Sequence, residues 1–281
     1  MANRTPLFHA EHSARYARQQ LLRQYQDTND VNLIVVIDQM GWTNVTILEE
    51  LLVDCDPAKD LHVLLASPGG DGEIALRMVT SMQKRCRELT VLVPDMAKSA
   101  ATILCLGANH IVMGPGGDLG PIDPQMLYVD ETGRQTMSSA KDIVAAVEEA
   151  EQRTTQNPNA YPLFSSMLAD VNMVMLEQAR SALDRSESLM SEALAAAGRS
   201  PQQVGQLSAA LKPMLIDAPR SHSAVVSVDQ AAAVGLPAAP ADLNDESWHV
   251  IWQLWTHYFA LGCWPAGTRA FYEGIRASHE G

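Results

Sequence analysis

Four short apolar runs occur in the first part of the chain, and stretches with helical spacing separate them. The runs are rich in β-branched residues and lack polar alternation, as expected of parallel strands covered on both faces. They lie at residues 33–37, 62–66, 90–94 and 111–113. Apolar residues recur every three or four positions over 47–52 and 74–82, which is the period of an amphipathic helix. This alternation predicts right-handed crossovers and a parallel sheet.

The chain changes character beyond about residue 136. Helical patterns cover 139–151, 165–185, 187–197 and 201–211, residues 224–228 form a short extended piece, and an aromatic-rich helix precedes a polar tail. The sequence therefore predicts an α/β fold with helices on both faces of the sheet and a helical C-terminal half. We expect an N-terminal helical extension at 1–29, a main domain at 30–240 and an aromatic-rich C-terminal helical extension at 241–281.

Charge and composition exclude several kinds of protein. The net charge of -13 argues against a broad nucleic-acid interface, because phosphate binding needs clustered Lys and Arg. The N-terminus lacks the apolar core of a signal peptide, and no run reaches the roughly 18 apolar residues of a spanning helix. The cysteines form no CxxC pair, and histidines show no zinc-site spacing. We therefore expect a cytoplasmic protein without a membrane anchor, cofactor or metal.

Two polar interruptions follow successive strands, at the edge where open α/β sheets place their active sites. In the turn at 67–72, Gly69 and Gly70 allow close backbone approach and can direct N–H groups at an oxyanion. Such a turn can equally be simple chain punctuation. Ser99 stands between the third strand and an all-apolar helical segment. A serine there usually caps the helix, but as a nucleophile it would gain from the helix dipole.

These two motifs together carry a family resemblance. The segments ASPGGDGEIA (66–75) and DMAKSAATILCLGANHIVMGPGGDLGPIDPQ (95–125) resemble the Clp-peptidase and signal-peptide-peptidase group within the crotonase fold. Residues 117–125 are similar to the branch called serine dehydrogenase proteinases. The resemblance implies a ClpP/crotonase-like sheet of ββα units and a serine peptidase acting on peptides or unfolded protein. It implies that Ser99 attacks the peptide carbonyl and that amides of Gly69 or Gly70, with that of Ala100, stabilise the oxyanion.

The proton acceptor for Ser99 is where the sequence departs from the better-known Clp peptidases. Those relatives carry a His soon after the nucleophile helix and later an Asp, whereas this chain has Asp123 and then His222. The same two residue types could therefore act from exchanged positions. Lys141 and Lys98 are alternative bases, as in signal-peptide peptidases, although Lys98 does not share a face with the next residue. A surface histidine, a turn aspartate and a solvated lysine are the non-catalytic alternatives.

The resemblance also implies partners and leaves other functions open. Relatives form homo-oligomers that hide their active sites, and the absence of an ATPase motif implies a separate ATPase or activating partner. We expect the helices at both chain ends to serve as assembly surfaces. An acyl-CoA hydratase or isomerase would use the same fold, and Ser99 would then have only a structural role. The chain, however, has few Lys and Arg residues to bind the phosphate groups of CoA. A catalytically silent scaffold is the third alternative, because fold does not fix function.

Overall fold

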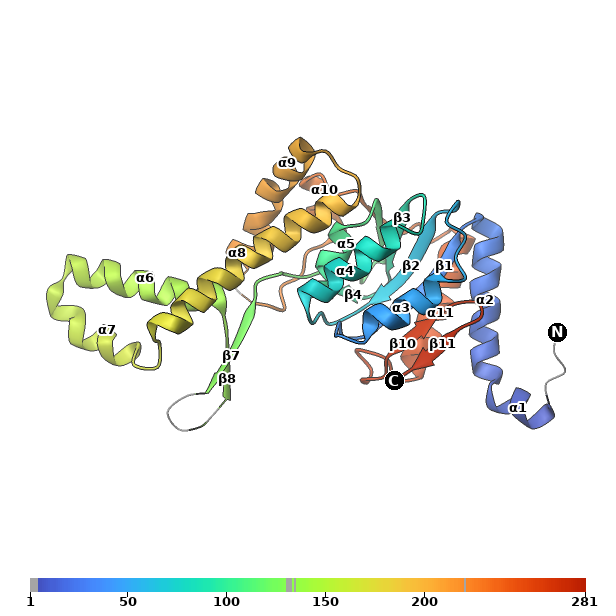
Figure 1. Cartoon of the computed structure of the whole chain (residues 1–281), viewed down its shortest axis with the longest axis horizontal. Coiled ribbons are helices and arrows are strands. Elements are labelled where there is room, and N and C mark those ends of the chain that lie inside the picture. The colour runs from blue at the N-terminus through green and yellow to red at the C-terminus, as the bar shows by residue number, and fades with distance from the viewer. Residues whose placement is uncertain (1–4, 130–132, 134, 220) are drawn as a thin grey trace.

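A seven-stranded sheet forms the centre of the computed structural model, which describes residues 5–129, 133, 135–219 and 221–281. The strand order is β11-β10-β1-β2-β3-β5-β9. Strands β1 to β9 of this sheet are mutually parallel, and β10 and β11 run antiparallel at one edge (Figure 1). The bounds are β1 Asn32–Ile37, β2 Leu61–Ala66, β3 Leu89–Val93, β5 His110–Met113, β9 Ala238–Pro240, β10 Phe271–Glu273 and β11 Ser278–Glu280. The predicted α/β class with a mostly parallel sheet is confirmed.

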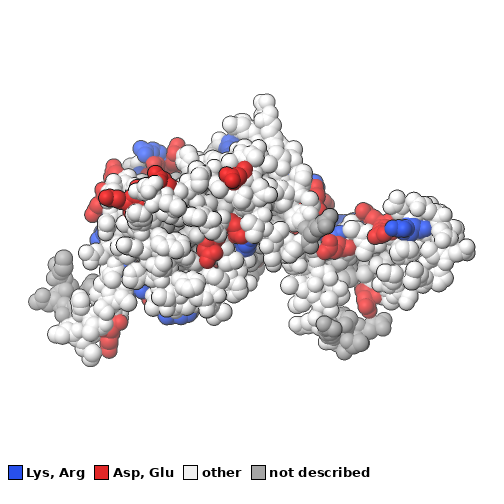
Figure 2. All heavy atoms as spheres, turned by 180° about the vertical axis from the view of Figure 1, so that it is seen from behind, with Lys and Arg blue, Asp and Glu red and all other residues white. Residues whose placement is uncertain are grey.

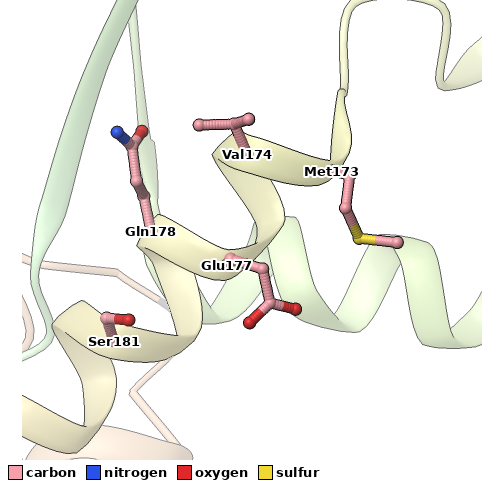
Figure 3. Close-up of a pocket in the computed structure, with 5 residues that line it drawn as sticks. All are labelled: Met173, Val174, Glu177, Gln178 and Ser181. Atoms are coloured by element: carbon pink, nitrogen blue, oxygen red, sulfur yellow. The ribbon is translucent and has the colours of Figure 1, made fainter.

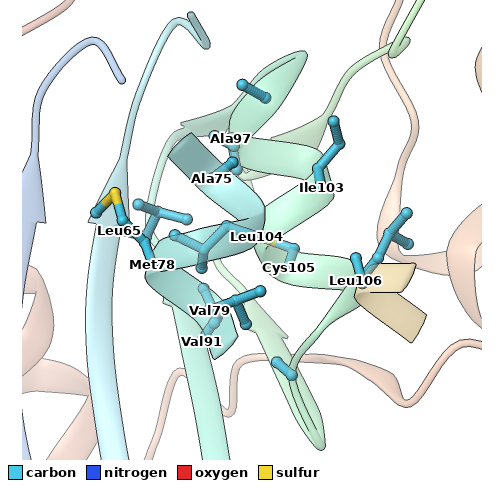
Figure 4. Packing of buried hydrophobic residues seen from close by; sticks show 14 of the residues in the cluster. Leu65, Ala75, Met78, Val79, Val91, Ala97, Ile103, Leu104, Cys105 and Leu106 are labelled. Carbon is cyan, nitrogen blue, oxygen red and sulfur yellow. The ribbon is translucent and has the colours of Figure 1, made fainter. Parts of the chain in front are cut away.

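Helices cover both faces of the sheet, which explains why its central strands are apolar without alternation. In β1, Ile34 and Val36 pack into the core beneath α3, α4 and α5, whereas Leu33 and Val35 pack against α2 and α11. Figure 4 shows part of the first core, where side chains of α4 and α5 meet those of β2 and β3. These helices are α2 Ser13–Asn29, α3 Asn44–Leu52, α4 Gly72–Gln83, α5 Ala100–Leu106 and α11 Glu246–Ala260.

Part of the helical half forms an arm that projects from the sheet in Figure 1. The arm consists of the β7–β8 hairpin, α6, α7 and the first half of α8. Helix α8 is one continuous helix of 24 residues where the sequence predicted two, because no Gly or Pro interrupts it. The remaining elements are α1 Pro6–Glu11, β7 Gln125–Val129, β8 Gln135–Ser139, α6 Ala140–Gln156, a 3₁₀ turn Pro158–Ala160, α7 Tyr161–Met167, α8 Met173–Ala196, α9 Pro201–Lys212, a π turn Pro213–Asp217 and α10 Val228–Ala233.

The chain ends differ from the sequence prediction. The polar tail contributes β10 and β11, strands of three residues each that are too short to show a period. Helices α2 and α11 pack on each other and on the sheet, although Trp252 and Phe259 of α11 remain 47% and 46% exposed, so their role as assembly surfaces stays a prediction. Arg18 and Glu273 form a buried ion pair of 2.6 Å between α2 and β10, and the Tyr258 hydroxyl donates to the same carboxylate.

A second, two-stranded parallel sheet positions the segment before Ser99. It pairs β4 Met96–Ala97 with β6 Asp118–Leu119. The predicted extended piece at 224–228 is reduced to one antiparallel bridge between Val226 and Leu119. Within the described ranges, each helix is either too short or too polar to traverse a lipid bilayer.

Candidate active site

Ser99 occupies a strained position at the start of α5. Its backbone angles are φ 50° and ψ -116°, a conformation that non-glycine residues avoid and that recurs at functional sites. The Ser99 side chain makes no capping hydrogen bond to the helix. It lines a cavity of about 500 Å³ instead. Because the hydroxyl is not used as an N-cap, the usual structural role of a serine at this position does not account for it.

The Gly69 turn is pressed directly against Ser99. The Ser67 N–H donates to the Met96 carbonyl and the Lys98 N–H donates to the Ser67 carbonyl, both at 3.0 Å. Gly69 has φ 109°, and a Cβ there would lie 2.7 Å from the Cβ of Ser99. Only glycine satisfies both the backbone angle and this close approach.

The N–H groups of Gly70 and Ala100 are available to a substrate. The Gly69 N–H is taken, because it donates to the Ser67 hydroxyl at 3.1 Å. Gly70 is held against Met40 by neighbouring backbone bonds, and its own N–H has no acceptor within the ranges that the structure describes. Ala100, the first residue of α5, likewise has no intrahelical acceptor for its N–H. Both residues line the Ser99 cavity, whereas Gly69, the other predicted glycine, does not.

Asp123 and His222 form a hydrogen-bonded pair in the wall of the same cavity. Although 99 positions separate them, His222 Nδ1 lies 2.9 Å from Asp123 Oδ1. With Nδ1 donating to the carboxylate, Nε2 is the unprotonated nitrogen that can accept a proton. The carboxylate is 1% exposed and the imidazole 34% exposed. The structure thus brings together the two residue types that the sequence placed in exchanged positions.

The charge on Asp123 is stabilised by its neighbours. Burial of this carboxyl acts to raise its pKa, but hydrogen bonds from His222 and Ser139 outweigh burial. The charge of Lys141 adds to this effect, so the pKa of the Asp123 carboxyl lies below its usual range. A carboxylate that remains ionised can hold the imidazole in one tautomer and orientation.

The two lysines that the sequence offered as bases occupy different places. Lys98 Nζ lies 2.5 Å from Asp118 Oδ2, and Lys98 does not line the cavity. Lys141 Nζ donates to the Pro219 carbonyl and lies 3.7 Å from Asp123 Oδ2. The structure therefore separates Lys98 from the reacting groups and places Lys141 behind the Asp123–His222 pair.

Two positioning residues were not found from the sequence. The Ser139 hydroxyl donates to Asp123 Oδ2 at 2.8 Å, and the Gln125 amide donates to the same oxygen at 3.1 Å. Ser139 precedes a helix, so from the sequence it is indistinguishable from an ordinary N-cap. Gln125 is the last residue of the family-like segment 117–125, which was the one available signal.

The rest of the cavity combines an apolar wall with a charged rim. Ile103, Ile122 and Leu189 supply apolar surface. At the rim, Arg185 pairs with Glu73 at 2.6 Å and with Glu192 at 2.5 Å, so its guanidinium is already neutralised. Among the described residues, no three His, Cys, Asp or Glu side chains gather as metal ligands would.

Other hollows carry no comparable chemistry. A groove of about 430 Å³ on α8 is lined by Met173, Val174, Glu177, Gln178 and Ser181, which Figure 3 shows on successive turns of one helix. On the face in Figure 2, Lys and Arg occur in small separate groups interspersed with Asp and Glu, and much of the surface is uncharged. That face offers no broad basic patch.

Comparison with curated proteins gives short matches. No protein-family model matches the chain. The uncharacterized protein MJ0137 of Methanocaldococcus jannaschii is 32% identical over 68 residues, which are 24% of this chain and 24% of that protein. The uncharacterized protein MJ1495 of the same organism is 26% identical over 66 residues, 24% of this chain and 23% of that protein. The match thus spans about a quarter of each relative.

Similar solved structures are proteases. A serine-to-alanine mutant of the 1510-N membrane-bound stomatin-specific protease gives a TM-score of 0.44 at 14% identity, covering 76% of this chain and 80% of that one. A lysine-to-alanine mutant of that protease with a substrate peptide gives 0.42 at 15%, covering 87% and 85%. A ClpP1 mutant from Listeria monocytogenes gives 0.42 at 13%, covering 80% and 99%. Similarity at this level does not assign an activity, and the serine dehydrogenase proteinase branch stays a prediction.

Proposed function

We propose that this chain is a serine peptidase that hydrolyses peptide bonds in peptides or unfolded segments, with Ser99 as the nucleophile. One observation carries the proposal. A strained serine without a capping bond shares a cavity with two backbone N–H donors and a hydrogen-bonded Asp–His pair whose carboxylate is buried. Nucleophile, oxyanion donors, base and orienting carboxylate are the groups that acyl transfer requires.

In the proposed reaction, the Ser99 oxygen attacks the substrate carbonyl carbon while its proton passes to His222 Nε2. The developing oxyanion accepts hydrogen bonds from the N–H groups of Gly70 and Ala100. Removing one donor of this kind typically costs about 2.7–4 kcal/mol of transition-state stabilisation. His222 then returns the proton to the leaving amine, and the C–N bond breaks to give an acyl-enzyme. Water, deprotonated by His222, attacks the ester and releases Ser99.

Lys141 is the second candidate for the base, because it lies near the pair. Its Nζ, however, donates to the Pro219 carbonyl and lies 3.7 Å from the Asp123 carboxylate, and Lys141 does not line the Ser99 cavity. We therefore assign Lys141 to positioning Asp123 and stabilising its charge. Lys98 pairs with Asp118 and does not line the cavity either.

The alternative functions find less support. An acyl-CoA enzyme needs cations for phosphate groups, but the cavity's guanidinium, on Arg185, is engaged by two glutamates. A silent scaffold has no need for a strained serine, and strained backbone costs roughly 1–3 kcal/mol. The peptidase proposal uses both the strain at Ser99 and the free N–H groups.

Hydrolysis of casein and of fluorogenic peptides, measured for the wild type and for Ser99→Ala, tests the proposal. Ser188→Ala is the matched control, because Ser188 is an exposed serine that bonds only the Asp184 carbonyl on α8. We expect hydrolysis by the wild type and the control, and none by Ser99→Ala. Equal rates for all three proteins would leave only the scaffold alternative.

Self-association is part of the same proposal. The projecting arm exposes large apolar side chains, including Tyr161, Leu163, Met167 and Met173 at 61–71% exposure. Contiguous exposed apolar surface is typical of interaction sites. Light scattering after size-exclusion chromatography should show an oligomer that Leu163→Glu and Met173→Glu dissociate. A wild-type monomer at all concentrations would contradict this.

Any unfolding of folded substrates would come from a separate ATPase partner.

A further inference from the structure

A second cavity, of about 490 Å³, lies between α11 and the loops that follow β3 and β5. It shares no lining residue with the Ser99 cavity, so it is a separate site on the described chain. Its volume is in the range that holds a small organic ligand. The lining residues are Pro94, Asp95, Pro115, Gly116, Leu243, Trp248, His249, Trp252 and Trp255.

Three tryptophans form one wall of this cavity. Trp248, Trp252 and Trp255 recur at spacings of four and three, so they share one face of α11. Trp248 and Trp255 are 6% and 3% exposed and are anchored in the core, whereas Trp252 is 47% exposed. The wall is therefore rigid at its base and open at Trp252. The faces of indole rings attract cations because they carry negative electrostatic potential.

The opposite wall carries a carboxylate without a partner. Asp95 forms no ion pair, and its carboxylate accepts no hydrogen bond from the residues that the structure describes. The adjacent Asp118 is only half satisfied: Lys98 contacts its Oδ2, while its Oδ1 is buried without a partner. The Lys98 ammonium thus pairs with Asp118, and its charge acts on Asp95 only from beyond ion-pair distance. A partly buried carboxylate in this state favours a cation, because desolvating it alone is costly.

The remaining polar group of the cavity does not compensate. His249 Nε2 lies 2.8 Å from the Leu243 carbonyl oxygen and donates to it, which fixes the ring. A metal ion is a poor occupant, because hard cations need several oxygen ligands and the lining offers one carboxylate. An uncharged apolar ligand would cover Asp95 without pairing it.

We propose that this cavity binds a small organic cation, an alkylated ammonium group on an apolar body, with Trp252 against its methyl groups and Asp95 as the counter-charge. The proposal rests on the aromatic wall and the unpaired carboxylate together. It does not depend on the peptidase proposal.

Ligand-observed saturation-transfer NMR tests the proposal with two probes of equal shape. Choline carries the positive charge, and 3,3-dimethylbutan-1-ol is its uncharged carbon isostere. We expect choline to bind at least roughly tenfold more tightly, because only choline gains from the ring faces and from Asp95. Equal binding of the two probes, or saturable binding of neither, would overturn the proposal.

Three variants refine the test. Asp95→Asn should weaken choline binding roughly tenfold and leave the alcohol unchanged. Trp252→Phe keeps a ring face and should weaken choline only about threefold. Trp42→Ala is the control, since Trp42 is 77% exposed and lies outside the cavity. Unchanged choline binding by Asp95→Asn would refute the proposal, and Ser99→Ala should bind choline like the wild type.

Discussion

Replacing Asp123 with asparagine tests how the imidazole of His222 is held. Asp123 accepts hydrogen bonds at both oxygens, from His222 at one and from Ser139 and Gln125 at the other. An amide has one acceptor oxygen and one donor nitrogen, so it cannot accept on both sides. If the amide nitrogen faces His222, Nδ1 must become the acceptor and the ring proton moves to Nε2. The nitrogen that should take the Ser99 proton is then blocked.

The magnitude follows from the exposure of the ring. The same replacement in a buried chymotrypsin-type triad lowers kcat about 10⁴-fold, which corresponds to about 5.4 kcal/mol. His222 is 34% exposed, so water can accept the hydrogen bond from Nδ1 in a fraction of the variant molecules and keep their imidazole in the productive tautomer. We therefore expect Asp123→Asn to lower kcat about 10³-fold, or about 4 kcal/mol, with little change in KM.

Steady-state hydrolysis of a fluorogenic peptide measures this effect. Ser139→Ala is the matched control, because it removes one hydrogen bond from the same carboxylate and leaves the carboxylate in place. One such bond is worth about 0.5–1.5 kcal/mol, so activity should fall by roughly tenfold or less. A mild effect of Asp123→Asn together with inactivity of Lys141→Gln would refute the assignment and identify Lys141 as the base.

Three further predictions concern stability, measured by chemical and thermal unfolding. Gly69→Ala should lower the free energy of unfolding by about 1–3 kcal/mol, because the new Cβ would meet Ser99. Gly205→Ala on α9 is the control, because a Cβ there meets open space and should stabilise the protein slightly. Equal effects of the two substitutions would contradict this. Burial lowers the pKa of His62 to about 4, so between about pH 6.5 and pH 4 the unfolded state binds a proton that the folded state does not. The free energy of unfolding should therefore fall by at most about 3 kcal/mol as the pH drops through this range. His62→Gln should remove this pH dependence, and an unchanged pH dependence would refute the reasoning. Arg18→Met should cost about 3–5 kcal/mol by leaving the Glu273 carboxylate buried and uncompensated, and a loss below 1 kcal/mol would contradict that.

The central strands and the position of Ser99 beside the glycine turn could be predicted from the sequence. Apolar runs such as 33–37 are long enough to show burial on both faces, and the structure places them in the parallel sheet. The turn at 67–72 and Ser99 follow adjacent strands, so the sheet brings them together. Local pattern and topology suffice for these features.

Other features depend on contacts between distant segments. The three-residue strands of the tail are specified by pairing, β10 with β1 and β11 with β10, and not by their own sequence. Asp123 and His222 could be named as residue types, but their 2.9 Å contact depends on long-range pairing, such as the bond from the Ile122 N–H to the Leu215 carbonyl in the π turn. Sequence spacing correctly indicated that Lys98 does not face Ser99, yet its partner Asp118 lies 20 positions away on β6. Ser139 was missed because a hydroxyl before a helix has a simpler explanation.

Covalent labelling with a fluorophosphonate probe tests the central claim most directly. Intact-protein mass spectrometry of the wild type should show one adduct that peptide mapping assigns to Ser99, and Ser99→Ala should remain unlabelled. Absence of an adduct on folded wild-type protein, or an adduct that persists in Ser99→Ala, would contradict the account.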